Sequence, residues 1–537
     1  MVSQRKAGAI LGYANIIVKN LVNLVYTPML LAFVGQADYG VYQTANSFVF
    51  SLTLLTFGFS EAYIRFYTQK KAKGTEEDVR SLNGMYLALY AMISSIALVL
   101  GLLFAANVGL FFSGSFTFDQ VGLAGELMAI MAVNVAAVLF STVFDAYIMA
   151  HEQFKFQQSR QMFTTLATPG IAFVLLNFGM GAVGVALAQL AVTLTLLALN
   201  MHYAVSKLGM RFSLRRFDGA LFHAVAAFSA WIFANQVCDL VNQSVPNMML
   251  GALTNAVTVS VFAVALQIRQ IFYSLSTTMS SVFVPKINRI VAESDDNGVL
   301  TRLMTRVGRY QMFLFCWVYC GFVLLGRFFI TKWAGEGFLD TYYLICAMTL
   351  PVGVPLCQNT GIEIQRAKNR HRARSVVYLC MACLNVLFTW FASPVLGYWA
   401  PAIAYIASIA LGNGLFMNWY YQARIGLDMA YFWKKNLPVV LASAVVLAAC
   451  MGLALLLPVT SWLLFLVGAS STPCFSLPQC GSSFSIQARS RRSRLNCPSC
   501  VRRFFLCLSP FRRSRCWEMR AVVAAPVPRG ARNPASG

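Results

Sequence analysis

Residues 9–34 read AILGYANIIVKNLVNLVYTPMLLAFV, a long and mostly apolar run close to the start of the chain. A helix crosses the ~30 Å hydrocarbon core of a bilayer with about 20 mainly apolar residues. The run is therefore long enough to span a membrane. It is also too long and too studded with polar side chains for the apolar core of a cleavable signal peptide, so we expect this helix to remain in the protein.

The rest of the chain repeats this pattern. Of its 537 residues 58% are hydrophobic and 11% are charged, whereas soluble globular proteins average about 45–50% apolar and ~25% charged residues. The composition predicts an all-α polytopic membrane protein with about fourteen transmembrane helices. They are expected near 9–34, 41–63, 82–106, 122–149, 162–179, 182–204, 221–243, 250–279, 310–330, 341–363, 375–394, 397–420, 437–457 and, cut short, 460–468.

The connecting loops test this division independently, because cytoplasmic loops of membrane proteins are enriched in Lys and Arg. The N-terminus and every second loop hold 26 Lys and Arg residues, and the opposite loops hold only Arg327 and Lys332. We therefore expect a multi-pass protein of the bacterial inner membrane with a cytoplasmic N-terminus. The net charge of +23 reflects this asymmetry and a basic C-terminal tail, so we expect no nucleic-acid partner.

A weak internal repeat suggests two halves. KNLVNLVYTPMLL (19–31) recurs as CDLVNQSVPNMML (238–250), and GVYQTANSFVFSL (40–52) is echoed by SVFAVALQIRQIFYSL (260–275). The offset corresponds to six helices, so both halves keep the same orientation, as in parallel repeats around an axis along the membrane normal. We expect one six-helix lobe over 1–207, a second over 208–425, and two additional helices over 426–468.

The remaining segment, 469–537, has a different character. It contains twelve Arg, no Lys, one acidic residue and six of the fourteen Cys. It could be a disordered basic extension that binds anionic lipid, or a zinc module around CPSC (497–500). We favour a third interpretation, a translated wrong frame of GC-rich coding sequence.

Ionisable residues inside spans are the candidate functional residues, because each costs about 2.5–3.5 kcal/mol at the bilayer centre. Lys19 lies midway along the first expected span, between Asn15 and Asn23, and Arg269 lies in the eighth, beside Gln267. The stripe of residues 15, 19 and 23 would line water or a substrate path, or form a hydrogen-bonded seam between helices. Lys19 and Arg269 could instead extend to the membrane interface.

Two cations in a membrane cavity would select an anionic group, and the pyrophosphate of a lipid carrier is the obvious candidate. The acidic residues within spans are Asp145, Asp239 and Glu363. These carboxylates could couple transport to Na⁺ or H⁺, or balance a neighbouring cation. We expect no metal site and no catalytic residues.

Three stretches carry a family resemblance. They are NIIVKNLVNLVYTPMLLAFVGQADYGVYQTANSFVF (15–50), GFSEAYIRFYTQKK (58–71) and TNAVTVSVFAVALQI (254–268). Together with the alternation of apolar hairpins and basic loops, they resemble the polysaccharide transporter (Wzx-type flippase) branch of the multidrug/oligosaccharidyl-lipid/polysaccharide exporter superfamily, over roughly residues 5–465. The resemblance implies a two-lobed fold with helices one and seven lining a central cavity, and alternating access between leaflets.

The function expected from these features is transport of an undecaprenyl-pyrophosphate-linked oligosaccharide for surface polysaccharide synthesis. The alternative is a cation-coupled multidrug or metabolite antiporter of the same superfamily. An enzyme is not expected, because the extracytoplasmic loops are short, no nucleotide-binding motif occurs, and His151, His202, His223 and His371 lie on separate segments. We expect no cofactor. The expected partners are the lipid-linked oligosaccharide, the bilayer, and the polysaccharide polymerase and chain-length machinery.

Overall fold

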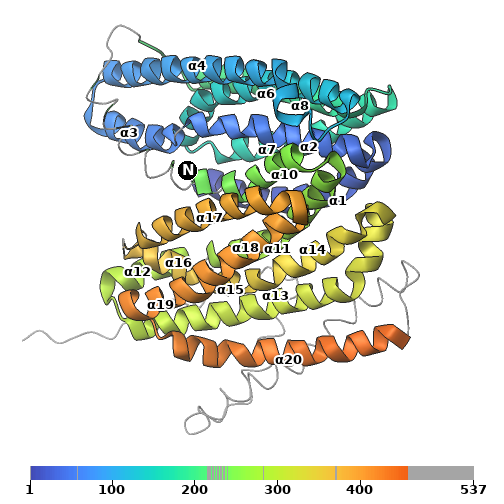
Figure 1. Ribbon diagram of the computed structural model, residues 1–537. Helices are drawn as coiled ribbons and strands as arrows, with labels where there is room; N and C mark the ends of the chain where they lie inside the picture. The colour runs from blue at the N-terminus through green and yellow to red at the C-terminus, as the bar shows by residue number, and fades with distance from the viewer. Residues whose placement is uncertain are drawn as a thin grey trace, which may run out of the picture. The chain divides into compact units, whose positions relative to one another are not determined.

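The computed structural model describes residues 2–456, except positions 57, 282, 369 and 371 and most of the segment 214–239, where only 219, 223, 225, 229, 233 and 236–238 are described. The described part is helical and contains no strand (Figure 1). Its first half contains α1 (Val2–Val34), α2 (Gln36–Phe50), α3 (Phe59–Lys73), α4 (Glu76–Ala106), α5 (Val108–Phe112), α6 (Phe118–Ala150), α7 (Phe154–Asn177) and α8 (Gly181–His202).

The second half begins with α10 (Val245–Leu253), α11 (Ala256–Ser281), α12 (Val284–Glu293) and α13 (Asn297–Trp333). It continues with α14 (Leu339–Thr349), α15 (Gly353–Cys357), α16 (Asn359–Ala367), α17 (Arg372–Leu396), α18 (Trp399–Ser408), α19 (Asn418–Tyr420) and α20 (Met429–Leu456). Short 3₁₀ and π segments join several of these helices. The all-α fold class is thus confirmed.

The expected spans can be compared with the helices one by one. The described residues contain eleven helical segments that are long and apolar enough to cross a membrane, and each of them coincides with one expected span. The fifth expected span corresponds to α7, which is a 24-residue helix but is not among those eleven. Twelve of the 23 positions of the seventh span lie outside the described residues, and the fourteenth span and the tail 469–537 lie wholly outside them. The number fourteen therefore stays a prediction.

Local sequence signals set the helix ends. Thr75 and Thr117 each begin a helix with a capping box, in which the threonine hydroxyl accepts from the third residue's amide and that residue's side chain accepts in return. Asp296 caps α13 by accepting from the amides of Gly298 and Val299. Gly35, with φ of 85°, turns the chain between α1 and α2 in a conformation that favours glycine.

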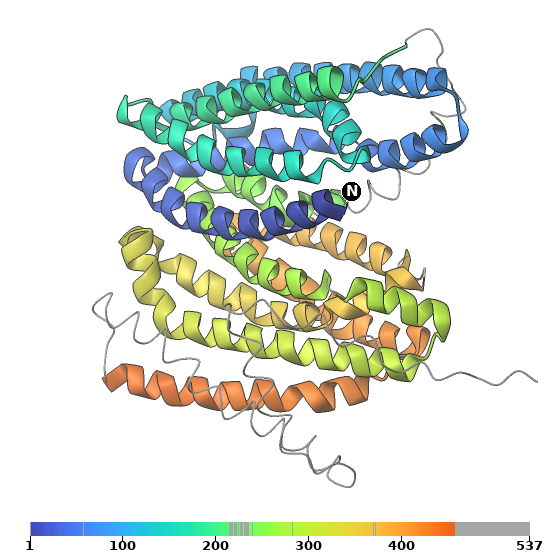
Figure 2. The same cartoon turned by 180° about the vertical axis from the view of Figure 1, so that it is seen from behind.

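Packing brings particular helices side by side. α1 runs along α7, α6 packs between α4 and α8, and α20 lies along α13 (Figures 1 and 2). The two segments of the second repeat, in α2 and α11, pack against each other. The two helices approach very closely at Gly40 of α2, where a Cβ would lie only 1.8 Å from the carbonyl oxygen of Ala256, the first residue of α11. Glycine is therefore required at this helix crossing.

Candidate functional site

Four helices of the first half, α1, α6, α7 and α8, line an open polar cavity of about 680 Å³. Its lining is rich in hydroxyl and amide groups. The polar lining residues are Lys19, Asn23, Tyr26, Asn134, Ser141, Thr142, Asp145, Gln157, Arg160, Gln161, Thr164, Thr165, Thr168, Gln189, Thr193 and Asn200. A cavity of this size falls within the range of about 300–1,000 Å³ that ligand pockets occupy.

The lining follows helical spacing on each wall. On α7 the polar residues at 157, 161, 164 and 168 recur at i, i+4, i+7 and i+11, and on α8 those at 189, 193 and 200 share the same register. Residues with this spacing lie on one face of a helix. The polar stripe explains why α7 is less hydropathic than its neighbours, since one of its faces borders the cavity instead of lipid.

Lys19 is the uncommitted cation of this cavity. Its side chain is exposed and lines the cavity. No hydrogen bond or ion pair joins it to any other residue that the structure describes. Arg160 differs, because its Nη2 lies 2.6 Å from Oδ1 of Asp145 and its Nη1 donates to Oδ1 of Asn200 at 2.6 Å. Asn200 in turn donates to the hydroxyl of Ser141 at 2.8 Å. The cavity thus holds one compensated ion pair and one free positive charge.

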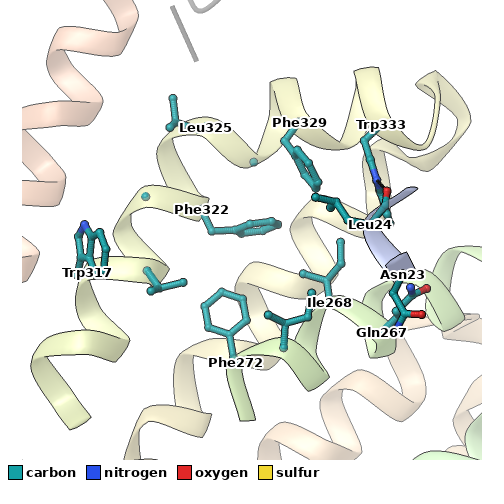
Figure 3. Close-up of a pocket in the computed structure, with 14 residues that line it drawn as sticks. Asn23, Leu24, Gln267, Ile268, Phe272, Trp317, Phe322, Leu325, Phe329 and Trp333 are labelled. Atoms are coloured by element: carbon teal, nitrogen blue, oxygen red, sulfur yellow. Dashed lines mark hydrogen bonds between the residues drawn. The ribbon is translucent and has the colours of Figure 1, made fainter. Parts of the chain in front are cut away.

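A second cavity, of about 350 Å³, is apolar and lies between α1, α11 and α13. Figure 3 shows the aromatic side chains of Phe272, Trp317, Phe322 and Phe329 around it, with Asn23 and Gln267 together at one end. Asn23 also lines the polar cavity. The two cavities therefore share a residue of α1, so a polar and an apolar compartment adjoin along this helix.

The predicted residues on α1 and α11 are distributed unevenly over these compartments. Asn23 borders both cavities, and Gln267 borders the apolar one, where it donates to the hydroxyl of Thr27 at 2.7 Å. Asn15 is buried and donates to the carbonyl and the side chain of Gln158 on α7, at 2.8 and 2.9 Å. Asn15 thus belongs to a hydrogen-bonded seam between α1 and α7, which was the alternative to lining a substrate path.

Arg269 lines neither cavity. It is 5% exposed, its guanidinium lies 4.1 Å from the ring centroid of Tyr405, and Nη2 lies 3.5 Å from the carbonyl oxygen of Asn242. Among the described residues it has no carboxylate partner. The structure therefore does not bring Arg269 and Lys19 into one cavity, and the cation that accompanies Lys19 is Arg160.

Of the three acidic candidates, two belong to ion pairs. Asp145 lies on the cavity wall in its pair with Arg160, and Glu363 pairs with Arg366 at 2.9 Å on α16. Asp239 lies outside the described residues. Across the described part, no three His, Cys, Asp or Glu side chains are grouped so that they could hold a metal ion.

Residues 30–343, more than half of the chain, match the model of a family described as "Polysaccharide biosynthesis protein". The chain belongs to this family. Its relatives include EpsK of Bacillus subtilis (strain 168), described as an uncharacterized membrane protein, which is 23% identical over 471 residues covering 84% of this chain and 90% of EpsK. The resemblance to the polysaccharide transporter branch of the superfamily is thereby confirmed.

Solved structures of membrane transporters share the fold of this polysaccharide biosynthesis protein. The structure titled "Lipid II flippase MurJ, inward closed conformation" matches with a TM-score of 0.72 at 15% identity, over 90% of this chain and 100% of that one. An inward-facing multidrug resistance transporter of the MATE family matches with a TM-score of 0.63 at 12% identity, over 78% and 95%. The protein is thus a multi-pass membrane protein with the fold of these transporters.

Arg160 is the residue of the polar cavity that sequence reasoning missed. The expected fifth span began at 162, which left Arg160 among the cytoplasmic loop cations. α7 begins eight residues earlier, at Phe154, so Arg160 is carried inside the helix and toward the cavity. The sequence did contain a sign of this position, because Arg160 directly precedes Gln161 and belongs to the same run of regularly spaced polar residues on α7.

Proposed function

We propose that this transporter moves an undecaprenyl-pyrophosphate-linked oligosaccharide across the bacterial inner membrane by alternating access. The observation that carries the proposal is the junction of the two cavities at Asn23. Such a substrate is an amphiphile with three parts, a hydroxylated glycan, an anionic linker and a long apolar chain. A polar cavity with a free cation beside an apolar cavity offers a compartment for each part.

Lys19 is the proposed partner of the anionic linker. A free ammonium can form a charge-assisted hydrogen bond with a phosphate oxygen, and such bonds are about twice as strong as those between neutral groups. The aromatic walls of the second cavity suit the isoprenoid chain, which is apolar and carries no polar groups. Arg269, stacked on Tyr405, is proposed to hold the packing of α11 that shapes the apolar cavity.

The alternative, a cation-coupled multidrug or metabolite antiporter, is supported by the fold likeness to the MATE transporter. Against it, the described carboxylates Asp145 and Glu363 are already paired with Arg160 and Arg366. A carboxylate whose oxygen is already engaged by an arginine has fewer oxygen positions free to bind a coupling cation. Export of a cationic drug that depends on Asp239 would favour this alternative.

The cellular setting is part of the proposal. The 26-to-2 distribution of Lys and Arg over the loops supports a cytoplasmic N-terminus in the inner membrane. The lipid-linked oligosaccharide would be received from the cytoplasmic leaflet and delivered to a polysaccharide polymerase and its chain-length machinery on the outer side. No such partner is needed for the transport step itself.

The deciding experiment is deletion of the gene, followed by measurement of lipid-linked oligosaccharide in each leaflet and of polysaccharide at the cell surface. We expect the oligosaccharide to accumulate in the cytoplasmic leaflet while the surface becomes bare. Reintroduced Lys19→Arg should restore export and Lys19→Ala should not, with Lys332→Ala as the matched control, because Lys332 is exposed at the end of α13. Normal surface polysaccharide after deletion would contradict the proposal.

A further inference from the structure

Two buried polar atoms on the wall of the polar cavity have neither a hydrogen-bond nor an ion-pair partner among the described residues. They are the hydroxyl of Tyr26 on α1 and Oδ1 of Asn134 on α6, and both residues line the cavity. A buried polar group left unpaired costs about 1–3 kcal/mol, so each such group asks for an explanation. A ligand with hydroxyl groups, bound in the cavity, would supply the missing partners.

The same cavity presents further polar side chains that are not used within the protein. The side chains of Gln157, Gln161, Thr168 and Thr193 line it and form no hydrogen bond with another described residue. Other lining groups are partly occupied, since Gln189 donates to the hydroxyl of Tyr42 at 2.6 Å. The free groups come from α7 and α8, so they face the stripe of α1 that carries Lys19.

The chemical character of the wall narrows the class of ligand. Amide and hydroxyl groups both donate and accept hydrogen bonds, and they lie on all four helices around the cavity. The only charges among the lining residues are Lys19 and the Asp145–Arg160 pair, which leaves one net positive charge. Such a wall suits a ligand that is mainly neutral and rich in hydroxyl groups, and it does not suit a cationic drug.

We infer that the polar cavity between α1, α6, α7 and α8 is the subsite of this transporter that binds and selects the glycan. Side chains of α7 and α8, with Gln161 and Thr193 at their centre, bind sugar hydroxyls there, and Tyr26 and Asn134 complete the hydrogen bonding from the other side. The inference rests on the proposed function and adds to it, because it assigns the sugar to one set of helices. Selectivity among glycans then resides in the first half of the chain.

The Asp145–Arg160 pair fits this assignment. Both groups reach the lining while holding each other at 2.6 Å, so they present a fixed acceptor and a fixed donor without adding net charge. Neighbouring hydroxyls of a sugar ring can bind such a pair together. An ion pair that is already formed also keeps the carboxylate from repelling an anionic linker held at Lys19.

The test is a binding measurement on the full-length protein in lipid nanodiscs. One probe is undecaprenyl-pyrophosphate carrying the oligosaccharide, purified from the strain that lacks the gene, and the other is undecaprenyl pyrophosphate without sugar. Wild-type protein should bind the glycosylated lipid more tightly, by roughly tenfold or more, since several hydrogen bonds each contribute about 2- to 10-fold to a binding constant.

Two substitutions on the same helix separate the subsite from general packing. Thr193→Val replaces a hydroxyl that lines the cavity, and Thr195→Val makes the same replacement at a position that is exposed and outside the lining. Thr193→Val should weaken binding of the glycosylated lipid by about 2- to 10-fold and leave binding of the sugar-free lipid unchanged. Thr195→Val should change neither, and Gln161→Leu combined with Thr193→Val should remove most of the preference.

The outcomes distinguish this inference from the proposed function. If wild-type protein binds both lipids equally, or if the double variant keeps the full preference, the sugar is not read in this cavity and the inference fails while the flippase proposal stands. If wild-type protein binds neither lipid, the proposed function fails and the inference fails with it. An unchanged thermal unfolding midpoint in each variant confirms that the fold is retained.

Discussion

Lys19 and Arg269 carry the same charge, but their surroundings give them different tasks. Lys19 faces a cavity and is free of partners among the described residues, whereas Arg269 is buried against Tyr405. A desolvated cation stacked on an aromatic ring contributes about 2 kcal/mol. An exposed lysine that touches nothing contributes little to the free energy of unfolding.

We therefore predict that Lys19→Ala and Arg269→Ala both abolish export but differ in stability. Lys19→Ala should leave the free energy of unfolding within about 0.5 kcal/mol of wild type, and Arg269→Ala should lower it by about 2 kcal/mol. Unfolding of the purified proteins in one detergent measures this difference, and Tyr405→Leu should reproduce the loss seen for Arg269→Ala. Equal stability of the two alanine variants would contradict the division of roles.

His151 gives the chain a second testable residue, outside the membrane-spanning helices. Its Nδ1 lies 2.9 Å from the carbonyl oxygen of Tyr147, so this nitrogen carries the proton, and its Nε2 then accepts from the hydroxyl of Tyr67 at 3.1 Å. Burial lowers the pKa of His151 below its usual 6.5, and the positive charge of Lys71 lowers it further. The folded state thus favours the neutral imidazole.

The sign of the pH dependence follows from this shift. Below pH 6.5 the unfolded chain takes up the proton more readily than the folded protein, so stability is lost as the pH falls toward the folded-state pKa. We predict that the thermal midpoint of wild type declines between pH 7.5 and 5.5 more steeply than that of His151→Gln, which keeps an acceptor for Tyr67. Parallel pH profiles of the two proteins would show that His151 does not contribute.

At the scale of elements, a proline in α1 explains a contact with α13. Pro28 lies inside α1 and has no amide hydrogen, so the carbonyl of Leu24 loses its partner within the helix. Nε1 of Trp333, at the end of α13, donates to this carbonyl oxygen at 2.6 Å. The sequence of one helix thus creates an acceptor that a distant helix occupies, at the edge of the apolar cavity.

This contact predicts a coupling between two substitutions. Trp333→Phe removes the indole donor and should lower the free energy of unfolding by about 1 kcal/mol. In a Pro28→Ala background the restored amide can bond to Leu24, so the same substitution should cost less. Denaturant unfolding of the four proteins in a double-mutant cycle measures the coupling, and strictly additive effects would rule out the shared carbonyl.

These helices also show which features of the site could be predicted from the sequence. The apolar run and the stripe of α1 predicted a spanning helix that borders a polar path, and Lys19 and Asn23 do line the cavity. A cavity bordered by this helix was expected, but its walls on α6, α7 and α8 were not predicted, because their polar residues are interspersed with apolar ones along each helix. Arg269 was grouped with Lys19 because both are intramembrane cations, although spacing along the chain cannot tell a cavity wall from a stacked interior position.

At the scale of the whole chain, several hydrogen bonds join the first half to the second. Gln36 donates to the carbonyl of Gly337 at 3.1 Å, and Ser115 donates to that of Gly251 at 2.6 Å. With the Trp333–Leu24 bond, these contacts lie toward the helix ends that the loop charges assign to the extracytoplasmic side. Alternating access requires that such bonds form in one state and break in the other.

We predict that a reversible bridge between positions 36 and 337 arrests transport. A Cβ at Gly337 would lie 2.7 Å from Oε1 of Gln36, so Gln36→Cys with Gly337→Cys, in a background without other cysteines, removes that amide and places two thiols close together. After treatment with a short bifunctional thiol reagent the protein should no longer move lipid-linked oligosaccharide in liposomes, and reductant should restore the rate. The single variant Gln36→Cys, treated identically, is the control and should remain active. Transport at the full rate with the bridge in place would show that the two halves need not separate at these residues, and alternating access through this side would have to be abandoned.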